Sequence, residues 1–161
     1  ALEENKKSLD IIVPQLKSIQ RDQGEKPTVQ FYDGKEGVLS SNEDIFSSKI
    51  DNEPVYIIYS RDLVKDVFSE KESGAMRNKR ISMGIHSKAI YTSNDGEKPS
   101  DATGDRMRLD ESKYPITSDI TVYGDKINIA LFGKRVSEIS IRSKEFADTI
   151  KSLIKYIFDH K

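Results

Sequence analysis

Hydrophobic residues in the middle of the chain form short apolar runs separated by longer amphipathic stretches. Three runs have the length and the β-branched and aromatic content of strands: 28–32, 54–60 and 85–93. Two stretches of helical character separate them, 34–49 and 61–83, and Gly84 ends the second. The pattern predicts a β-α-β-α-β unit whose parallel strands are joined by right-handed crossovers.

A polar loop at 94–105 follows, and the pattern then changes to closely spaced strands. Residues 119–133 indicate two strands around a two-residue turn, Gly124-Asp125, and residues 136–143 indicate a third. Such short connections favour antiparallel neighbours.

The last stretch, 143–160, is the clearest helix of the chain. Ser143 is suited to cap it, and one apolar stripe should lie across a sheet face: Phe146, Ile150, Leu153, Ile154, Ile157 and Phe158. The fold class is therefore α/β, with a mixed parallel and antiparallel sheet flanked by helices.

The first residues carry a heptad pattern. Apolar or seam positions follow one another at steps of three and four residues: Leu2, Asn5, Leu9, Ile12, Leu16 and Ile19. Pro14 predicts a kink. Residues 1–23 are therefore expected to be a linker helix, and residues 2–19 either pair with a second chain or pack on their own domain.

Composition excludes several classes of functional site. The chain has 161 residues, a formal net charge of −1, two histidines and no cysteine. Sites built on Cys or on several His are thereby excluded, and we expect no metal and no cofactor. A DNA-binding domain usually has a basic excess, which this chain lacks. No apolar run could span a bilayer, so a cytoplasmic protein without a membrane partner is expected.

One short motif suggests chemistry. His86 and Lys88 form His-x-Lys, the start of the His-x-Lys-x4-Asp motif of the phospholipase D superfamily. The aspartate position is Ser93, and the nearest acid, Asp95, lies two positions later, about 7 Å along a strand. We therefore interpret His86 as a polar residue that opens a strand. Catalysis by His86 and Lys88, as in a phosphodiesterase, remains the alternative.

From Thr28 onward the chain resembles the C-terminal effector domain of TrmB-type transcriptional regulators, a phospholipase D-like domain. Four segments in order carry the resemblance: "KPTVQFYDGKEGV", "RNKRISMGIHSKAIYTS", "RMRLDESKYPITSDITVYGDKINIALF" and "ISIRSKEFADTIKSLIKYIF". When the chain is aligned with that domain, the positions of the catalytic motif are occupied by Ser118, Ile120 and Asp125, so only the aspartate of the motif is retained. Serine and isoleucine cannot replace the nucleophilic histidine and the phosphate-binding lysine. The resemblance thus implies a domain, 28–161, that is no enzyme and has no catalytic residues.

The family has a winged helix-turn-helix, a linker and this domain, so the chain is expected to be a fragment that lacks the DNA-binding module. The resemblance implies a homodimer through residues 2–19, contact with DNA only through the missing module, and a small-molecule effector such as a sugar. The candidate ligand-binding residues are Ser60 and Arg61, after the strand at 54–60, and Ser118 at the degenerate motif. An interaction domain without a ligand is a further alternative.

Overall fold

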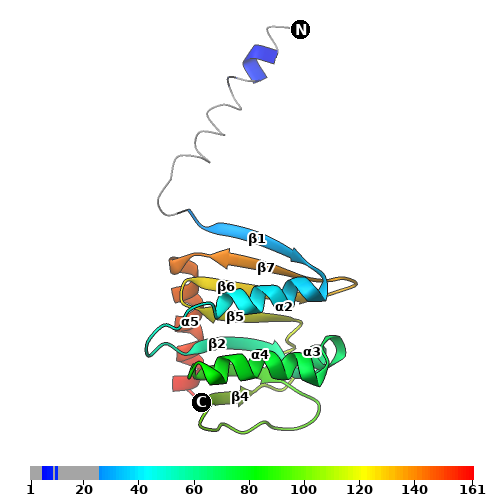
Figure 1. Ribbon diagram of the computed structural model, residues 1–161, viewed down its shortest axis with the longest axis vertical. Coiled ribbons are helices and arrows are strands. Elements are labelled where there is room, and N and C mark those ends of the chain that lie inside the picture. Colours follow the sequence, from blue (N-terminus) through cyan, green and yellow to red (C-terminus); the bar gives the residue numbers. More distant parts are fainter. Residues whose placement is uncertain (1–4, 9, 11–25) are drawn as a thin grey trace.

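A computed structural model describes residues 5–8, 10 and 26–161 (Figure 1). Its strands are β1 (Thr28–Asp33), β2 (Val55–Ser60), β3 (Ser87–Thr92), β4 (Gly104–Arg108), β5 (Ser118–Tyr123), β6 (Lys126–Phe132) and β7 (Val136–Arg142). Its helices are α2 (Gly34–Ile45), α3 (Arg61–Val67), α4 (Glu70–Ser82) and α5 (Lys144–Asp159). Residues 5–8 and 10 are helical, and the predicted linker at 1–23 otherwise lies outside the described residues.

The strands form one seven-stranded sheet in the order β1-β7-β6-β5-β2-β3-β4. β2, β3 and β4 are parallel neighbours, whereas β1, β7, β6, β5 and β2 pair antiparallel in that order. Together with its helices, this sheet confirms the predicted mixed α/β fold. The turn at Gly124 also lies where the sequence predicts it, and Gly124 has a φ of 62°.

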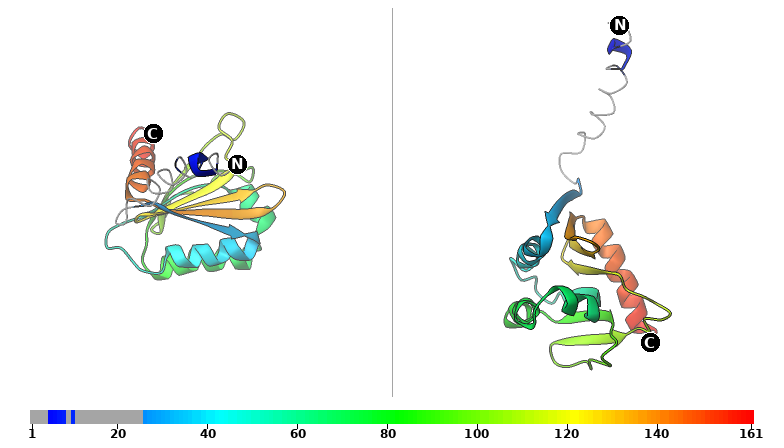
Figure 2. Two further views of the ribbon diagram at one scale, coloured as in Figure 1. Left: turned by 90° about the horizontal axis from the view of Figure 1, so that it is seen from above. Right: turned by 90° about the vertical axis from the view of Figure 1, so that its right-hand side faces the viewer.

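Helices cover both faces of the sheet. α5 lies on one face, and α2, α3 and α4 lie on the other (Figure 2). Beneath α5, Ile154 and Phe158 pack on Tyr56, Ile90 and Val122. Beneath the other helices two smaller cores form, around Ile45, Phe46 and Tyr123 and around Val38, Phe68 and Ala130. The sheet is therefore the layer that all three cores share.

The predicted helix at 61–83 is instead two helices, α3 and α4. The break falls at Phe68 and Ser69, both with extended backbone, where Phe68 turns its ring into the core. Ser69 begins α4 with a capping box: its hydroxyl accepts from the Glu72 N–H, and the Glu72 carboxylate accepts from the Ser69 N–H. Sequence periodicity missed the break because the apolar spacing continues across it.

β4 was also missed by the sequence, which indicated only a polar loop before residue 105. Its sequence, Gly-Asp-Arg-Met-Arg, has little strand propensity. Pairing with β3 forms the strand, because Gly104 lies against Ser87 so closely that a Cβ atom would meet the Ser87 Oγ at 2.0 Å. Tertiary contact therefore overrides local preference here.

α5 begins at its predicted cap, where the Ser143 hydroxyl accepts from the Phe146 N–H. The predicted apolar stripe was wrong in part, because the buried residues of α5 are Ala147, Lys151, Ile154 and Phe158. Lys151 lies in this row because its stem packs while its ammonium group contacts Glu53 and the Gly124 carbonyl. The row containing Phe146, Leu153 and Ile157 is exposed instead.

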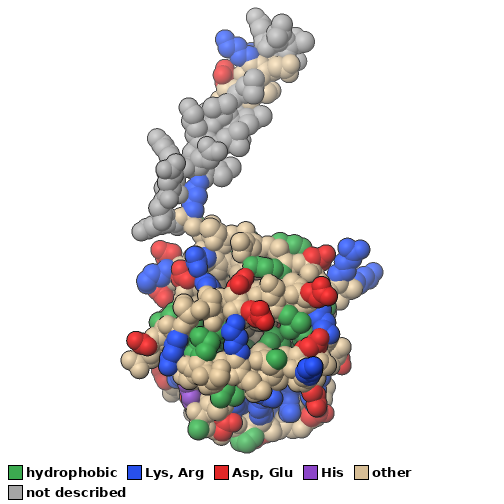
Figure 3. Space-filling view, viewed as in Figure 1, with side chains coloured by type: hydrophobic (Ala, Val, Ile, Leu, Met, Phe, Trp, Pro, Cys, Tyr) green, Lys and Arg blue, Asp and Glu red, His purple; other side chains and the backbone are tan. Residues whose placement is uncertain are grey.

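The surface over α2, α3 and α4 mixes acidic and basic side chains without a field of one sign (Figure 3). In the part of the chain that the structure describes, no helix has the length and apolarity to span a membrane.

Candidate functional site

Polar side chains form rows across the sheet beneath α2. Opposite residues of paired strands face the same side, so register alone aligns them. The first row crosses β5, β6, β7 and β1 through Asp119, Ala130, Glu138 and Tyr32. The second row runs beside it: Thr121, Asn128, Ser140 and Gln30. A face between two layers thus carries a largely polar strip.

Asn128 organises this strip. Its side-chain amide donates to the Ser41 Oγ at 2.8 Å and to the Ser41 carbonyl at 3.3 Å, and the Ser140 hydroxyl donates to its Oδ1 at 2.9 Å. Asn128 and Ser41 are both buried, at 3% and 2% exposure. Since buried polar groups are costly without partners, this network joins α2 to β6 and β7 in one arrangement.

A cleft of about 310 Å³ opens beside the network. Hydroxyl, amide and charged side chains from β1, α2, β6 and β7 line it: Thr28, Gln30, Tyr32, Ser41, Asp44, Ser47, Lys126, Asn128, Ser140 and Arg142. Lys126 is already engaged, donating to the Asp44 carbonyl at 3.2 Å. The volume reaches the lower end of the range for small-molecule sites.

Asn128 also lines a smaller inner cavity of about 50 Å³, which contains Asp119 and Glu138. Burial raises the pKa of the Glu138 carboxyl to about 7, against a hydrogen bond from Ser41. Burial raises the pKa of Asp119 to about 7 as well, and the nearby Glu138 adds to this, while the Ser60 N–H that donates to Asp119 opposes it. Among described atoms, Glu138 Oε2 has no hydrogen-bond partner.

The two cavities offer many hydrogen-bonding groups, and the charged side chains of the cleft are of both signs. A carboxyl whose pKa lies near 7 can donate when protonated and accept when ionised. Hydroxyls and amides do both at any pH. Such a surface suits a polyhydroxylated or otherwise neutral polar ligand. The described residues hold no group of three or more His, Asp or Glu side chains placed to bind a metal ion.

The structure places the sequence candidates beside this strip, not in it. Ser60 is buried, its hydroxyl caps α3 by accepting from the Leu63 N–H, and its own N–H donates to Asp119. Arg61 is the first residue of α3, and Ser118 opens β5. Ser118 is the neighbour of Asp119 along the strand, so it faces the α5 side. None of the three lines either cavity, and their role in ligand binding stays a prediction.

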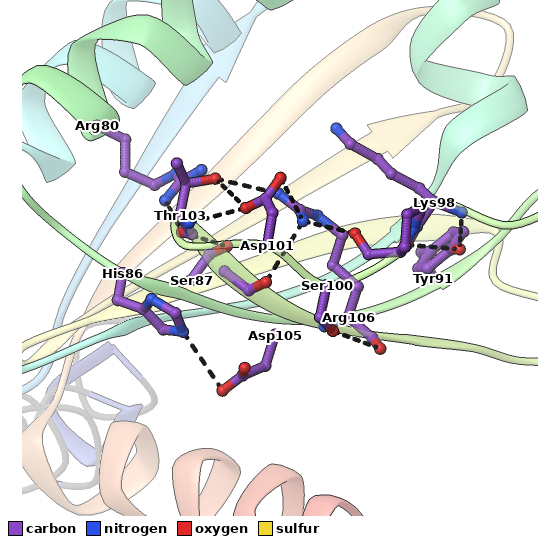
Figure 4. A network of polar contacts seen from close by, with 12 residues as sticks. Arg80, His86, Ser87, Tyr91, Lys98, Ser100, Asp101, Thr103, Asp105 and Arg106 are labelled. Atoms are coloured by element: carbon purple, nitrogen blue, oxygen red, sulfur yellow. Dashed lines mark hydrogen bonds and ion pairs between the residues drawn. The ribbon is translucent and has the colours of Figure 1, made fainter.

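His86 and Lys88 line neither the cleft under α2 nor its inner cavity. His86 precedes β3, and its Nε2 is 3.3 Å from the Asp105 Oδ2 in a half-exposed pair (Figure 4). Lys88 faces the α5 side, where its Nζ lies 5.6 Å from the centre of the Phe158 ring. The acid bonded to His86 is Asp105 of the neighbouring strand β4, which lies opposite Lys88, so the sequence spacing His-x-Lys-x4-Asp is not reproduced here.

The loop at 94–105 is held by its own network (Figure 4). The Tyr91 hydroxyl accepts from the Lys98 N–H at 2.5 Å, and Arg106 contacts Asp101 and the Pro99 carbonyl. Burial lowers the pKa of Lys98, and the guanidinium groups of Arg77, Arg106 and Arg61 lower it further. These bonds fix the loop against β4.

Sequence reasoning missed Asn128, Glu138, Thr121 and Ser140. Each stands at an alternating position of a strand, where a polar residue usually indicates a solvent-facing side. One signal was available: the predicted sheet had to be covered on both faces, so polar residues at matching positions of three successive strands would be buried together. Ser41 had no such signal.

Comparison with known proteins gives a fold and no family. No family model matches the chain, and no curated protein matches it. Among solved structures, NucT from Helicobacter pylori is similar at 13% identity, with a TM-score of 0.57 over 83% of this chain and 97% of NucT. TrmBL2, an archaeal chromatin protein whose structure shows a novel mode of DNA binding, is similar at 14% identity with a TM-score of 0.49. This chain is covered to 99% and spans 62% of TrmBL2. The likeness to NucT shows that the two chains share a fold.

Proposed function

We propose that this chain is the effector-sensing domain of a TrmB-like transcriptional regulator, built on a phospholipase D-like fold without catalytic activity. The observation that carries the proposal is the polar cleft under α2, which is joined to the buried Asn128 network and backed by two carboxyls. The four-segment sequence resemblance supports the regulatory role.

The effector is a small polyhydroxylated molecule such as a sugar. Of the residues that line the cleft, Gln30 is exposed and Tyr32 half-buried, whereas Ser41 and Asn128 are buried. A bound polyol would exchange hydrogen bonds with both sets and link β1 to α2. Because the ligand binds only the folded chain, it raises the unfolding temperature as its concentration exceeds its Kd.

A panel of mono- and disaccharides tests this by thermal shift, followed by calorimetric titration of each hit. We expect at least one sugar to raise the unfolding temperature and Gln30→Ala to weaken its binding at least tenfold. Ser112→Ala, in the exposed loop before β5, is the matched control and should bind like the wild type. Absence of any sugar response, or equal binding by Gln30→Ala, contradicts the cleft as an effector site.

The absence of catalysis is a separate proposal, supported by the position of His86 and Lys88. They lie on the α5 side and contact Asp105 and Phe158, and neither lines the cleft under α2 or its inner cavity. We expect no turnover of bis-p-nitrophenyl phosphate above background. Activity that disappears in His86→Ala would instead establish the phosphodiesterase alternative.

DNA binding belongs to a module outside this chain in the proposed regulator. The net charge of −1 and the mixed surface over α2 to α4 support this, since DNA affinity comes largely from cationic contacts with phosphate. In a mobility-shift assay at low salt, the 161-residue chain should not retard duplex DNA. Retardation that weakens steeply with salt would place a DNA contact within the chain itself.

A further inference from the structure

The sheet has two edge strands, β4 and β1, and they differ in how far their outer edges are protected from pairing with another strand. An unprotected edge is a template for pairing with another strand. At β4, three of five residues are charged, and the loop before it occupies the outer side: the Arg106 N–H donates to the Ser100 Oγ at 2.8 Å, and Gly104 exchanges backbone bonds with Asp101. That edge is closed by the chain itself.

In the part of the chain that the structure describes, β1 has none of these protections. Its sequence is Thr-Val-Gln-Phe-Tyr-Asp, without charge in the first five residues and without proline. It pairs only with β7, and within the described residues no backbone bond reaches its outer side. Val29 and Phe31 are 65% and 67% exposed, although both face the same side as the apolar residues Ile141 and Ile139 of β7. α5 contacts mainly β5 and β6, which lie further into the sheet (Figure 2).

We propose that β1 pairs antiparallel with β1 of a second copy of this chain, which joins the two sheets into one. A strand with alternating apolar residues and a free edge can pair with the same strand of a second copy, because the edge of each copy supplies backbone donors and acceptors to the other. The charges at the ends agree with this occupant. Lys26 lies two residues before the strand and Asp33 ends it, so an antiparallel pair places Lys26 of each copy near Asp33 of the other.

The side-chain pattern selects the register. Residues opposite one another in an antiparallel pair face the same side, so Val29 and Phe31 must face odd-numbered partners. If Gln30 is the central residue of the pair, Val29 of each copy lies opposite Phe31 of the other. Thr28 of each copy then lies opposite Tyr32 of the other. Pairs of an aromatic and a β-branched residue are among the favourable cross-strand combinations. Gln30 then lies opposite Gln30 of the second copy.

This pairing is independent of the predicted association through residues 2–19. Unlike that association, pairing through β1 lies close to the polar cleft, because Thr28, Gln30 and Tyr32 of β1 line the cleft. The second copy therefore stands at the rim of the cleft.

Light scattering on the full chain tests the association. We expect a mass of twice 18.3 kDa for the wild type at about 100 μM and a shift to the monomer in Phe31→Lys. Leu153→Lys, at an equally exposed apolar residue of α5, is the control and should remain dimeric. Circular dichroism of each variant verifies that it is folded. A monomeric wild type, or a dimer that Phe31→Lys leaves intact, overturns the proposal and in the second case points to residues 2–19.

Cross-linking tests the register, since the chain has no cysteine of its own. Gln30→Cys should form a disulfide-linked dimer under mild oxidation, because a disulfide requires Cα atoms within about 7 Å. Phe31→Cys, one residue away, should not. A cross-link in Phe31→Cys and none in Gln30→Cys contradicts the register, and no cross-link in either contradicts the pairing of β1.

Discussion

Glu138 shows at the scale of one residue what burial does to a carboxyl. Its side chain is 2% exposed, and its pKa is raised from 4.5 to about 7. Between about pH 4.5 and 7 the folded chain therefore holds a proton that the unfolded chain has released, so the contribution of Glu138 to stability is greatest below about pH 4.5 and is lost as pH rises through 7. The loss from this group amounts to about 3 kcal/mol.

Glu138→Gln should remove this loss, because the amide has nearly the same shape and does not ionise. We expect the variant to exceed the wild type in unfolding free energy at pH 8 and to match it at pH 5. Urea denaturation at the two pH values measures both quantities. Glu97→Gln, in the exposed loop, is the control, and a Glu138→Gln profile parallel to that of the wild type would contradict the assignment.

At the scale of an element, the start of α4 depends on Ser69. Its hydroxyl and the Glu72 carboxylate satisfy two N–H groups that the first turn leaves without partners inside the helix. Ser69→Ala should therefore lower the unfolding free energy by about 1 kcal/mol. Ser73→Ala, in the same helix, is the matched control, because its hydroxyl only bonds back to the Ser69 and Glu70 carbonyls. Urea denaturation of both variants decides, and equal losses would show that the cap contributes nothing specific.

At the scale of the whole molecule, one sheet carries hydrophobic cores on both of its faces. Ile154 is buried on the α5 side and Phe68 on the side of α3 and α4. We expect Ile154→Ala and Phe68→Ala each to cost about 2–5 kcal/mol and to lower the same single transition. Far-ultraviolet circular dichroism and tyrosine fluorescence should give coincident midpoints in each variant. Separate transitions would mean that the two sides of the sheet unfold independently.

Patterns local in the chain determined much of the fold. The alternation before residue 93, the turn at Gly124 and the cap at Ser143 depend on neighbours within a few residues, so the sequence predicted them. The same locality explains the errors. β4 exists because it pairs with β3, and the exposed row of α5 depends on how that helix lies over the sheet.

The candidate site and the free edge were decided by tertiary structure alone. Thr121, Asn128 and Glu138 come from three strands, and only strand order and register bring them under α2 beside Ser41. Likewise β1 begins the described domain yet pairs with β7 at its far end, which leaves Val29 and Phe31 exposed. Sequence by itself determined most of the strands and helices, because backbone propensity and hydrophobic period act locally, but not β4 or the break between α3 and α4. Which polar residues meet, and which apolar ones stay uncovered, was decided by long-range pairing.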